Sequence, residues 1–412
     1  MTPSWSDMTR TFGRIGLLSF GGPAAQIALM HEALVDRHKW LTEKDFLGAL
    51  SFCMLLPGPE AMQLATYTGW RLRGTLGGLL AGLLFVLPGA LVIAALAFAY
   101  AAYGDVPLVQ SAFLGIKALV IVIVFQALWR LSRKALKGRD HWVLAGLSFL
   151  ALFLFNLPFP LIILCATLWG LVTTRPTDRN SASLPADWPA TLRTALVWGL
   201  LWAAPLVLLS LFDAPFLTAL ALFFAKLAVV TFGGAYAVLA YMTQEVVQTH
   251  GWLTAPQMID ALGLAETTPG PLILVTQFTG HLAGILQGGW TLGLLAGLLT
   301  LWMTFVPCFL WIFTFAPHVD RLLSNPRLSG ALSAITAAVV GVILNLSIWF
   351  SLHVLFPEID APAGLPRSLG PLSPLAAILT ATAALALLRL TILPAIGVMA
   401  LLAMVLGHFF GL

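Results

Sequence analysis

The sequence contains few charged residues. Of its 412 residues, 9% are Asp, Glu, Lys or Arg and 59% are hydrophobic, and the mean hydropathy is +0.95. A soluble domain carries about 25% charged residues. This shortage excludes an ordinary soluble protein and indicates a chain that crosses a lipid bilayer many times.

Cysteine is also scarce. Cys53, Cys165 and Cys308 lie far apart in apolar stretches, so we expect small buried side chains rather than disulfides or metal ligands. The eight histidines show no metal-ligand spacing. The sequence also lacks a signal-peptide layout and any converging set of nucleophile, base or metal ligands. We therefore predict no metal, no other cofactor and no enzyme activity.

One stretch of the sequence occurs twice. The first copy opens at Ser19-Phe20-Gly21-Gly22-Pro23 and closes at Pro57-Gly58-Pro59. The second opens at Thr231-Phe232-Gly233-Gly234 and closes at Pro269-Gly270-Pro271, and a constant offset of 212 residues aligns the two without a gap. This spacing indicates an internal duplication. A duplicated apolar unit that is interrupted by Gly and Pro is typical of membrane transporters.

The apolar segments predict an all-α polytopic membrane protein. Each half has six segments, and one further helix at 191–211 joins them, so we expect about 13 membrane segments. In the first half they cover 12–30, 45–70, 75–102, 107–129, 142–156 and 159–173, and the first two are broken at the Gly-Gly and Pro-Gly-Pro motifs. The second half repeats this pattern over 217–286, 289–315, 328–352 and 373–410. Gly78 and Gly82 have the small-xxx-small spacing that favours tight helix packing.

The number of segments decides the relative orientation of the halves. Six segments return the chain to its starting side and the seventh crosses once more, so the second half enters from the opposite face and the repeats are inverted. Broken pairs that are re-entrant do not change this parity. The predicted domains are an N-terminal transporter repeat at 1–174, a cytoplasmic linker at 175–190, a connecting helix at 191–212 and a C-terminal transporter repeat at 213–412.

The cations indicate the orientation of the chain in the membrane. Loops with many Lys and Arg residues tend to be cytoplasmic. This rule predicts a cytoplasmic N-terminus and a periplasmic C-terminus, and it is supported most strongly by one basic loop, Arg130, Arg133, Lys134, Lys137 and Arg139. We interpret that loop as a topology signal and not as a nucleic-acid site. Trp40 and Trp252 are expected to be anchors at the membrane interface.

The duplicated breaks have the chemistry of an anion site. Glycine pairs can leave helical geometry, and each Pro-Gly-Pro should end one helix and begin another. A half-helix that begins inside the membrane presents free N–H groups and a partial positive charge, which suit a divalent oxyanion. The alternative is that these residues only permit close packing and kinks.

Cations in the apolar segments are candidates for contact with this anion. Arg14 and Lys226 each lie five residues before a Phe-Gly-Gly break, although Arg14 is also placed to reach the interface. Lys117 lies in the middle of its segment, where a buried carboxylate partner and substrate contact are both open. Glu60 directly follows Pro59, so it should lie in the first helical turn, where a carboxylate is favoured. We expect it either to cap the helix or to couple proton binding to anion binding, because a nearby dianion favours protonation.

The motifs together resemble the chromate ion transporter (CHR) family in its long, two-domain form. The resemblance is carried by Phe12-Gly13-Arg14-Ile15-Gly16-Leu17-Leu18-Ser19-Phe20-Gly21-Gly22-Pro23, by Trp40-Leu41-Thr42, and by Leu56-Pro57-Gly58-Pro59-Glu60-Ala61-Met62-Gln63-Leu64-Ala65. Lys226, Thr231-Phe232-Gly233-Gly234 and Thr268-Pro269-Gly270-Pro271 extend it over the second half. It implies a bacterial inner-membrane protein that exports chromate by means of the proton motive force and thereby confers chromate resistance.

The substrate site expected from both lines of reasoning draws on the two halves equally. Its members are Arg14, Ser19, Phe20, Gly21, Gly22, Pro57, Gly58, Pro59, Lys226, Thr231, Phe232, Gly233, Gly234, Pro269, Gly270 and Pro271, with Gln63, Lys117, Gln126, Glu266 and Asn345 as secondary candidates. Sulfate has the charge and nearly the shape of chromate, and a passive anion channel could use the same helix ends. These alternatives, the direction of transport and the presence of a homodimer remain open at this point.

Overall fold

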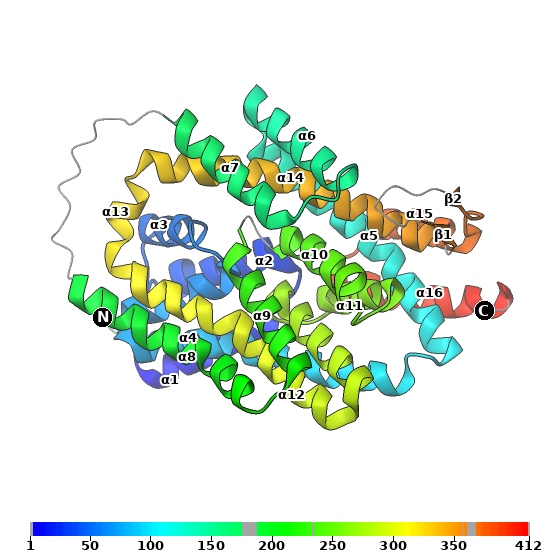
Figure 1. Ribbon diagram of the computed structural model, residues 1–412, viewed down its shortest axis with the longest axis horizontal. Helices are drawn as coiled ribbons and strands as arrows, with labels where there is room; N and C mark the ends of the chain where they lie inside the picture. The colour runs from blue at the N-terminus through cyan, green and yellow to red at the C-terminus, as the bar shows by residue number, and fades with distance from the viewer. Residues whose placement is uncertain (1–2, 175–187, 233–234, 357, 361–367, 411–412) are drawn as a thin grey trace. The chain divides into compact units, whose positions relative to one another are not determined.

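The structure is a computed structural model that describes residues 3–174, 188–232, 235–356, 358–360 and 368–410. Nearly all of the described chain is helical (Figure 1). The exception is a short antiparallel pair, β1 (Ile359–Asp360) with β2 (Ser368–Leu369). Most of the predicted linker, residues 175–187, lies outside the described residues, as do Gly233 and Gly234. The all-α prediction is confirmed.

The chain forms two compact units, and each takes segments from both halves of the sequence. The first unit comprises 1–96, 170–238 and 268–332, and the second comprises 97–169, 239–267 and 333–412. Both duplicated break motifs of each half belong to the first unit. The two sequence repeats are therefore intertwined in space and are not separate lobes.

The first unit is built from helices that the break motifs separate. They are α1 (Trp5–Leu18), α2 (Gly22–His31), the π-helix η1 (Glu32–Arg37), α3 (Glu43–Cys53), most of α4 (Glu60–Tyr103), α8 (Trp188–Leu211), α9 (Pro215–Val230), the 3₁₀ turns η3 (Leu272–Leu274) and η4 (Ala316–His318), α12 (Val275–Phe315) and α13 (Val319–Leu323). Thr42 is the N-cap of α3, because its hydroxyl accepts the N–H of Asp45 at 3.1 Å. The π-helix η1 follows α2 and ends at Arg37.

Helices α4 and α12 are each a tight helical hairpin. Non-helical backbone at Arg73 and Gly74 divides α4, and the same occurs at Gly288 and Gly289 in α12. The two limbs of α4 touch so closely that a Cβ atom on Gly69 would overlap the carbonyl oxygen of Gly77.

The glycine pattern of α4 serves this contact between helices. A Cβ on Gly82 would lie 2.6 Å from the ring of Phe309, and one on Gly78 would lie 2.6 Å from that of Phe313. Real Cβ atoms do not approach other atoms so closely, so only glycine fits at these two positions. The predicted small-xxx-small packing is confirmed.

Helix α8, which has no counterpart in the first half, lies along α12 within the same unit (Figure 1). Two tryptophans join these helices reciprocally. The indole N–H of Trp202 donates to the carbonyl oxygen of Met303 at 3.1 Å, and that of Trp302 donates to Leu201 at 3.2 Å. None of the residues of α8 is buried, although the helix is apolar. Its free surface therefore suits contact with lipid.

The second unit contains α5 (Pro107–Ala135) at its core. Helices α15 (Pro374–Ala386) and α16 (Ile392–Phe410) pack on α5, and Gly115 allows α16 to approach at Met399. The other helices of this unit are α6 (Arg139–Phe153), α7 (Phe159–Thr173), α10 (Ala235–Gln244), the π-helix η2 (Glu245–Thr249), α11 (Ala255–Thr267) and α14 (Pro326–Leu355). The turn between α15 and α16 lies between Ala386 and Ile392, and Pro394 fits the first turn of α16.

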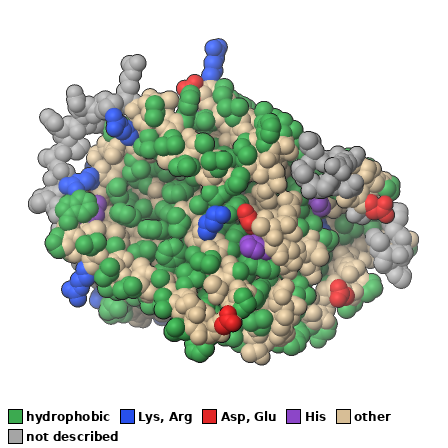
Figure 2. All heavy atoms as spheres, viewed as in Figure 1, with side chains coloured by type: hydrophobic (Ala, Val, Ile, Leu, Met, Phe, Trp, Pro, Cys, Tyr) green, Lys and Arg blue, Asp and Glu red, His purple; other side chains and the backbone are tan. Residues whose placement is uncertain are grey.

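The composition of the helices identifies a multi-pass membrane protein. Five helical stretches are long and apolar enough to cross a bilayer: Glu60–Tyr103, Pro107–Ala135, Trp188–Leu211, Leu272–Leu323 and Pro326–Leu355. Shorter apolar helices accompany them, and Figure 2 shows a face covered largely by hydrophobic side chains with few charges. The count of 13 segments and the inverted arrangement of the repeats remain predictions.

Candidate functional site

The first break motif interrupts the helix where the sequence predicts. Helix α1 ends at Leu18 and α2 begins at Gly22, and Gly21 and Gly22 both have positive φ angles, 84° and 78°. Side chains strongly disfavour this backbone conformation, which explains the glycine pair. Ser19 is fully buried in the break, and its hydroxyl donates to the carbonyl oxygen of Ile15 at 2.6 Å. In the second half, α9 ends at Val230, and Thr231 makes the same 2.6 Å bond to Leu227.

Both Pro-Gly-Pro motifs separate two helices, as predicted. The first lies between α3 and α4, and Glu60 is the first residue of α4. The second lies after α11, and there the 3₁₀ turn η3 intervenes before α12 begins at Val275. The central glycines are buried with positive φ angles, 125° at Gly58 and 89° at Gly270. The three residues of η3 therefore make the start of α12 different from that of α4.

The two halves exchange hydrogen bonds at these four breaks. The N–H of Gly58 donates to the carbonyl oxygen of Thr231 at 2.8 Å, and the N–H of Gly270 donates to that of Ser19 at 2.9 Å. Each Pro-Gly-Pro loop is thus joined to the Phe-Gly-Gly loop of the other half, within the first unit. The sequence did not predict this pairing. Its consequence is that the central glycine amides connect the loops and are not available to an anion.

Two buried glutamines donate side-chain hydrogen bonds to the backbone of the loops. The amide of Gln26 donates to the carbonyl oxygen of Gly270 at 2.7 Å and to that of Ser19 at 3.3 Å. The amide of Gln63, a secondary candidate, donates to Pro57 at 2.7 Å, while its own carbonyl oxygen is buried without a hydrogen-bond partner. The sequence analysis missed Gln26. Its signal is a single amide side chain in the otherwise apolar segment that follows the glycine pair.

The predicted cations of the site are accessible. Arg14 and Lys226 lie on α1 and α9, the helices that lead into the two Phe-Gly-Gly breaks, and both side chains are exposed. Glu60 is half-buried at the start of α4, as predicted for a residue of the first helical turn. Phe20 and Phe232 are half-buried in the loops. Both cations therefore lie at the surface of the helices that lead into the breaks.

The remaining candidates belong to the second unit. Lys117 on α5 forms an ion pair with Asp260 on α11, with 2.9 Å between Nζ and Oδ1, so the predicted pairing with a carboxylate is observed. Glu266 is buried on α11, and Gln126 is exposed on α5.

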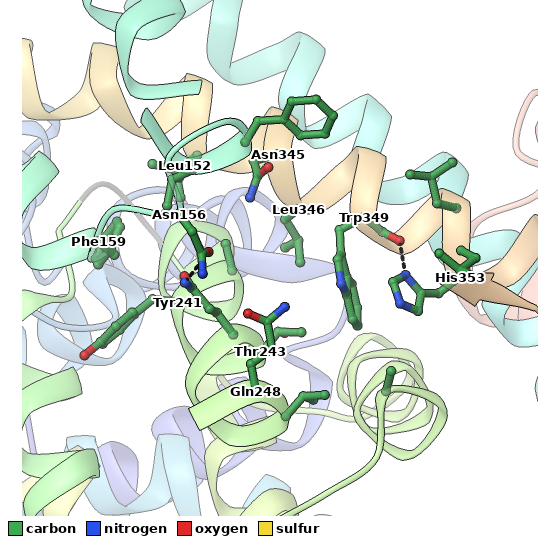
Figure 3. A pocket seen from close by; sticks show the side chains of 18 residues that line it. Leu152, Asn156, Phe159, Tyr241, Thr243, Gln248, Asn345, Leu346, Trp349 and His353 are labelled. Atoms are coloured by element: carbon green, nitrogen blue, oxygen red, sulfur yellow. Dashed lines mark hydrogen bonds between the residues drawn. The ribbon is translucent and has the colours of Figure 1, made fainter. Parts of the chain in front are cut away.

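Asn345 lines a cavity of the second unit with a volume of about 200 Å³. Asn156, Gln244, Gln248, Trp349 and His353 also face it (Figure 3). The amide of Gln244 donates to Asn156 at 2.6 Å. Among the described residues that line it there is no Lys or Arg, and the polar side chains are mainly neutral amides.

Comparisons with known proteins agree with these motifs. The chromate transporter family model matches residues 6–171 and 218–408. The chain is 33% identical over 349 residues to a chromate transport protein of Pseudomonas aeruginosa, which covers 82% of this chain and 79% of that protein. It is 29% identical over 352 residues to a chromate transport protein of Cupriavidus metallidurans, covering 81% of this chain and 79% of that protein.

A shorter relative matches only part of the chain. An uncharacterized transporter of Bacillus subtilis is 32% identical over 150 residues, which is 36% of this chain and 76% of that protein. No solved structure matches the chain. The family match spans both duplicated halves and includes every break motif, and on this evidence the chain belongs to the chromate transporter family.

Proposed function

We propose that the protein is a secondary transporter that exports chromate across the bacterial inner membrane. The names of the relatives in Pseudomonas and Cupriavidus support the substrate. The observation that carries the proposal is the reciprocal bonding of Gly58 to Thr231 and of Gly270 to Ser19. It gathers interrupted helices of both halves in one unit, which is the arrangement by which transporters hold small ions.

The donors to the oxyanion are the starts of the helices that follow the loops. The first N–H groups of a helix have no partner within it, and α2 and α4 begin at Gly22 and Glu60. Arg14 and Lys226 supply the positive charge that a dianion requires. One chain contributes both halves of the site, so the mechanism does not require a homodimer. The repeats are inverted in this proposal, with the N-terminus cytoplasmic and the C-terminus periplasmic.

Glu60 is the proposed link between proton and anion occupancy at these helix starts. Its carboxylate competes with the oxyanion for the same partial positive charge. Two negative charges close together at one helix start repel each other, so binding of the dianion favours the protonated form of Glu60. The second half has no equivalent, because Leu272 follows Pro271 in the 3₁₀ turn. The two halves are therefore functionally unequal.

Flux of labelled chromate in oriented vesicles tests the proposal. We expect outward transport that responds to an imposed proton gradient and is weakly inhibited by sulfate. Equal competition by sulfate would make the protein a general oxyanion transporter. A current that follows voltage alone and ignores pH would identify a passive anion channel.

The variant Glu60→Gln tests the role of the carboxylate. We expect it to retain chromate exchange between the two sides and to lose the dependence on the proton gradient. The matched control is Asp140→Asn, which removes an exposed carboxylate from the first turn of α6. Accumulation at the normal level in Glu60→Gln would assign Glu60 to helix capping.

A further inference from the structure

The second unit contains a buried cluster of ionisable groups that the proposed site does not use. Lys117 Nζ lies 2.9 Å from Asp260 Oδ1, and the hydroxyl of Tyr100 donates to Asp260 Oδ2 at 2.8 Å. Asp260 is 6% exposed, and the side chain of Lys117 is 19% exposed. Three helices meet at this point, because Tyr100 is on α4, Lys117 on α5 and Asp260 on α11.

The cluster lies in strongly apolar surroundings. Lys117 is ten residues after Pro107, the first residue of the 29-residue α5, which is one of the helices long enough to cross the membrane. A cation at that depth is unfavourable, so it usually has a partner or a function. A buried ion pair is also a poor source of stability, because apolar residues of similar size often serve as well or better. Ionisable groups of this kind therefore mark proton or ion pathways.

The charges around Asp260 are few. On its own helix the nearest other acid is Glu266, six residues away and therefore not on the same helical face. Helix α5 contributes Lys117, α4 contributes Tyr100, and Asp105 lies in the turn after α4. Helix α16, which also contacts α11, has no Asp, Glu, Lys or Arg over Ile392–Phe410, and its one titratable residue is His408. Within the ion pair itself, the charge changes by protonation of Asp260 or by deprotonation of Lys117.

We propose that Asp260 is a second proton-binding site of the transport cycle, distinct from Glu60. This inference rests on the proposed function as a proton-coupled transporter. The incoming proton adds to the Asp260 carboxylate, and Lys117 keeps its own proton. The pair then changes from net neutral to a charge of +1, and the ionic link between α5 and α11 is lost. Helix α11 continues directly into Thr268 and the Pro-Gly-Pro loop. Loss of the ion pair between α5 and α11 therefore allows α11, and with it this loop, to move.

Tyr100 is a positioning residue in this scheme. Its hydroxyl stabilises the charged carboxylate and leaves one oxygen to face Lys117. We expect Tyr100→Phe to retain proton binding and to move the pH midpoint of protonation upward by about one to two units, because the variant loses a hydrogen bond to the charged carboxylate. An unchanged midpoint would restrict Tyr100 to packing.

Infrared difference spectroscopy tests proton binding without any substrate. The purified protein in lipid should show a carbonyl band of a protonated carboxylic acid that grows as the pH falls. This band should disappear in Asp260→Asn and persist in Asp140→Asn, the control for an exposed acid on α6. If Asp260→Asn does not fold, Asp260→Glu should shift the band and its midpoint. A band that neither variant changes would overturn the proposal.

Proton and chromate fluxes in the same liposomes test the link to transport. Wild-type protein should move protons when chromate is added, as reported by an internal pH dye. Asp260→Asn should retain chromate exchange but lose at least about nine-tenths of the proton flux. Normal proton flux in this variant refutes the second site and leaves the proposed function intact. If wild-type protein moves no chromate while the infrared band still depends on Asp260, the proposed function fails and the proton site remains.

Discussion

Single residues around the break motifs fall into two groups, buried side chains that hold the loops and exposed cations that we propose to face a substrate. Ser19, Gln26 and Gln63 are fully or almost fully buried. The hydroxyl of Ser19 donates to the backbone of α1, and the amides of Gln26 and Gln63 donate to loop backbone, so these residues preserve the geometry. Arg14 and Lys226 are exposed instead. This separation means that substitutions of the cations should report on function and not on stability.

Neutral variants of the two cations test this separation. We expect Arg14→Gln or Lys226→Gln to lower chromate transport on the order of tenfold, because each removes a charged donor worth about 1.5–3 kcal/mol. The amount of membrane-inserted protein should not change. Arg10→Gln, an exposed cation on α1 before the duplicated stretch, is the control. Normal transport by both variants would make these cations structural or interfacial.

His31 predicts a local dependence of stability on pH. Its Nε2 lies 2.6 Å from Glu43 Oε2 and its Nδ1 lies 3.3 Å from Asp36, and the hydrogen bond to Glu43 is the main cause of a raised pKa for His31. Because the pKa of His31 in the folded state lies above the unfolded value of about 6.5, protonation of His31 stabilises the fold. This stabilisation is fully present below about pH 6.5 and is lost as the pH rises through the folded pKa. Thermal unfolding of wild type and His31→Gln should therefore differ at pH 5.5, by no more than about 2 °C, and agree at pH 8.5. A difference that persists at pH 8.5 would contradict this.

At the scale of elements, interrupted helices determine the site. The loops are held by backbone hydrogen bonds between halves, and these require two glycines in a conformation that other residues avoid. A Cβ atom on Gly58 would also lie 2.8 Å from the amide nitrogen of Gln63. The loops are therefore built for close backbone approach.

Alanine at these glycines should destabilise the site. We expect Gly58→Ala and Gly270→Ala each to lower the free energy of unfolding by roughly 1–3 kcal/mol, the usual cost of a strained backbone position. Both should also reduce transport. Gly13→Ala is the matched control, because it lies within α1 and its Cβ would contact nothing within 4 Å. Equal stability of all three variants would show that the loops tolerate a side chain.

At the scale of the whole molecule, the two halves of the sequence are not two spatial units. Each compact unit contains segments of both halves, and all four break motifs belong to one of them. The duplicated break motifs therefore lie together in one unit, as the proposed single composite site requires. The other unit contains the buried Lys117–Asp260 pair and the cavity beside Asn345.

Reporter fusions test the inverted topology. Fusions after Asp140, Glu358 and Leu412 should place Asp140 in the cytoplasm and the other two in the periplasm. The physical reason is the excess of Lys and Arg in the loops that the predicted topology places in the cytoplasm. A result with Asp140 and Glu358 on the same side of the membrane would exclude inverted repeats.

Local chemistry was sufficient to predict the membrane class and the breaks at Gly21-Gly22 and at both Pro-Gly-Pro motifs. These features depend on hydropathy and on the backbone limits of Gly and Pro, which act within a few residues. The partners of Gly58, Gly270 and Lys117 were not predictable. Each bond joins positions more than 140 residues apart, and such contacts are selected by packing of the whole chain. The tertiary structure alone decided that the glycine amides connect the halves and that Lys117 is matched by Asp260.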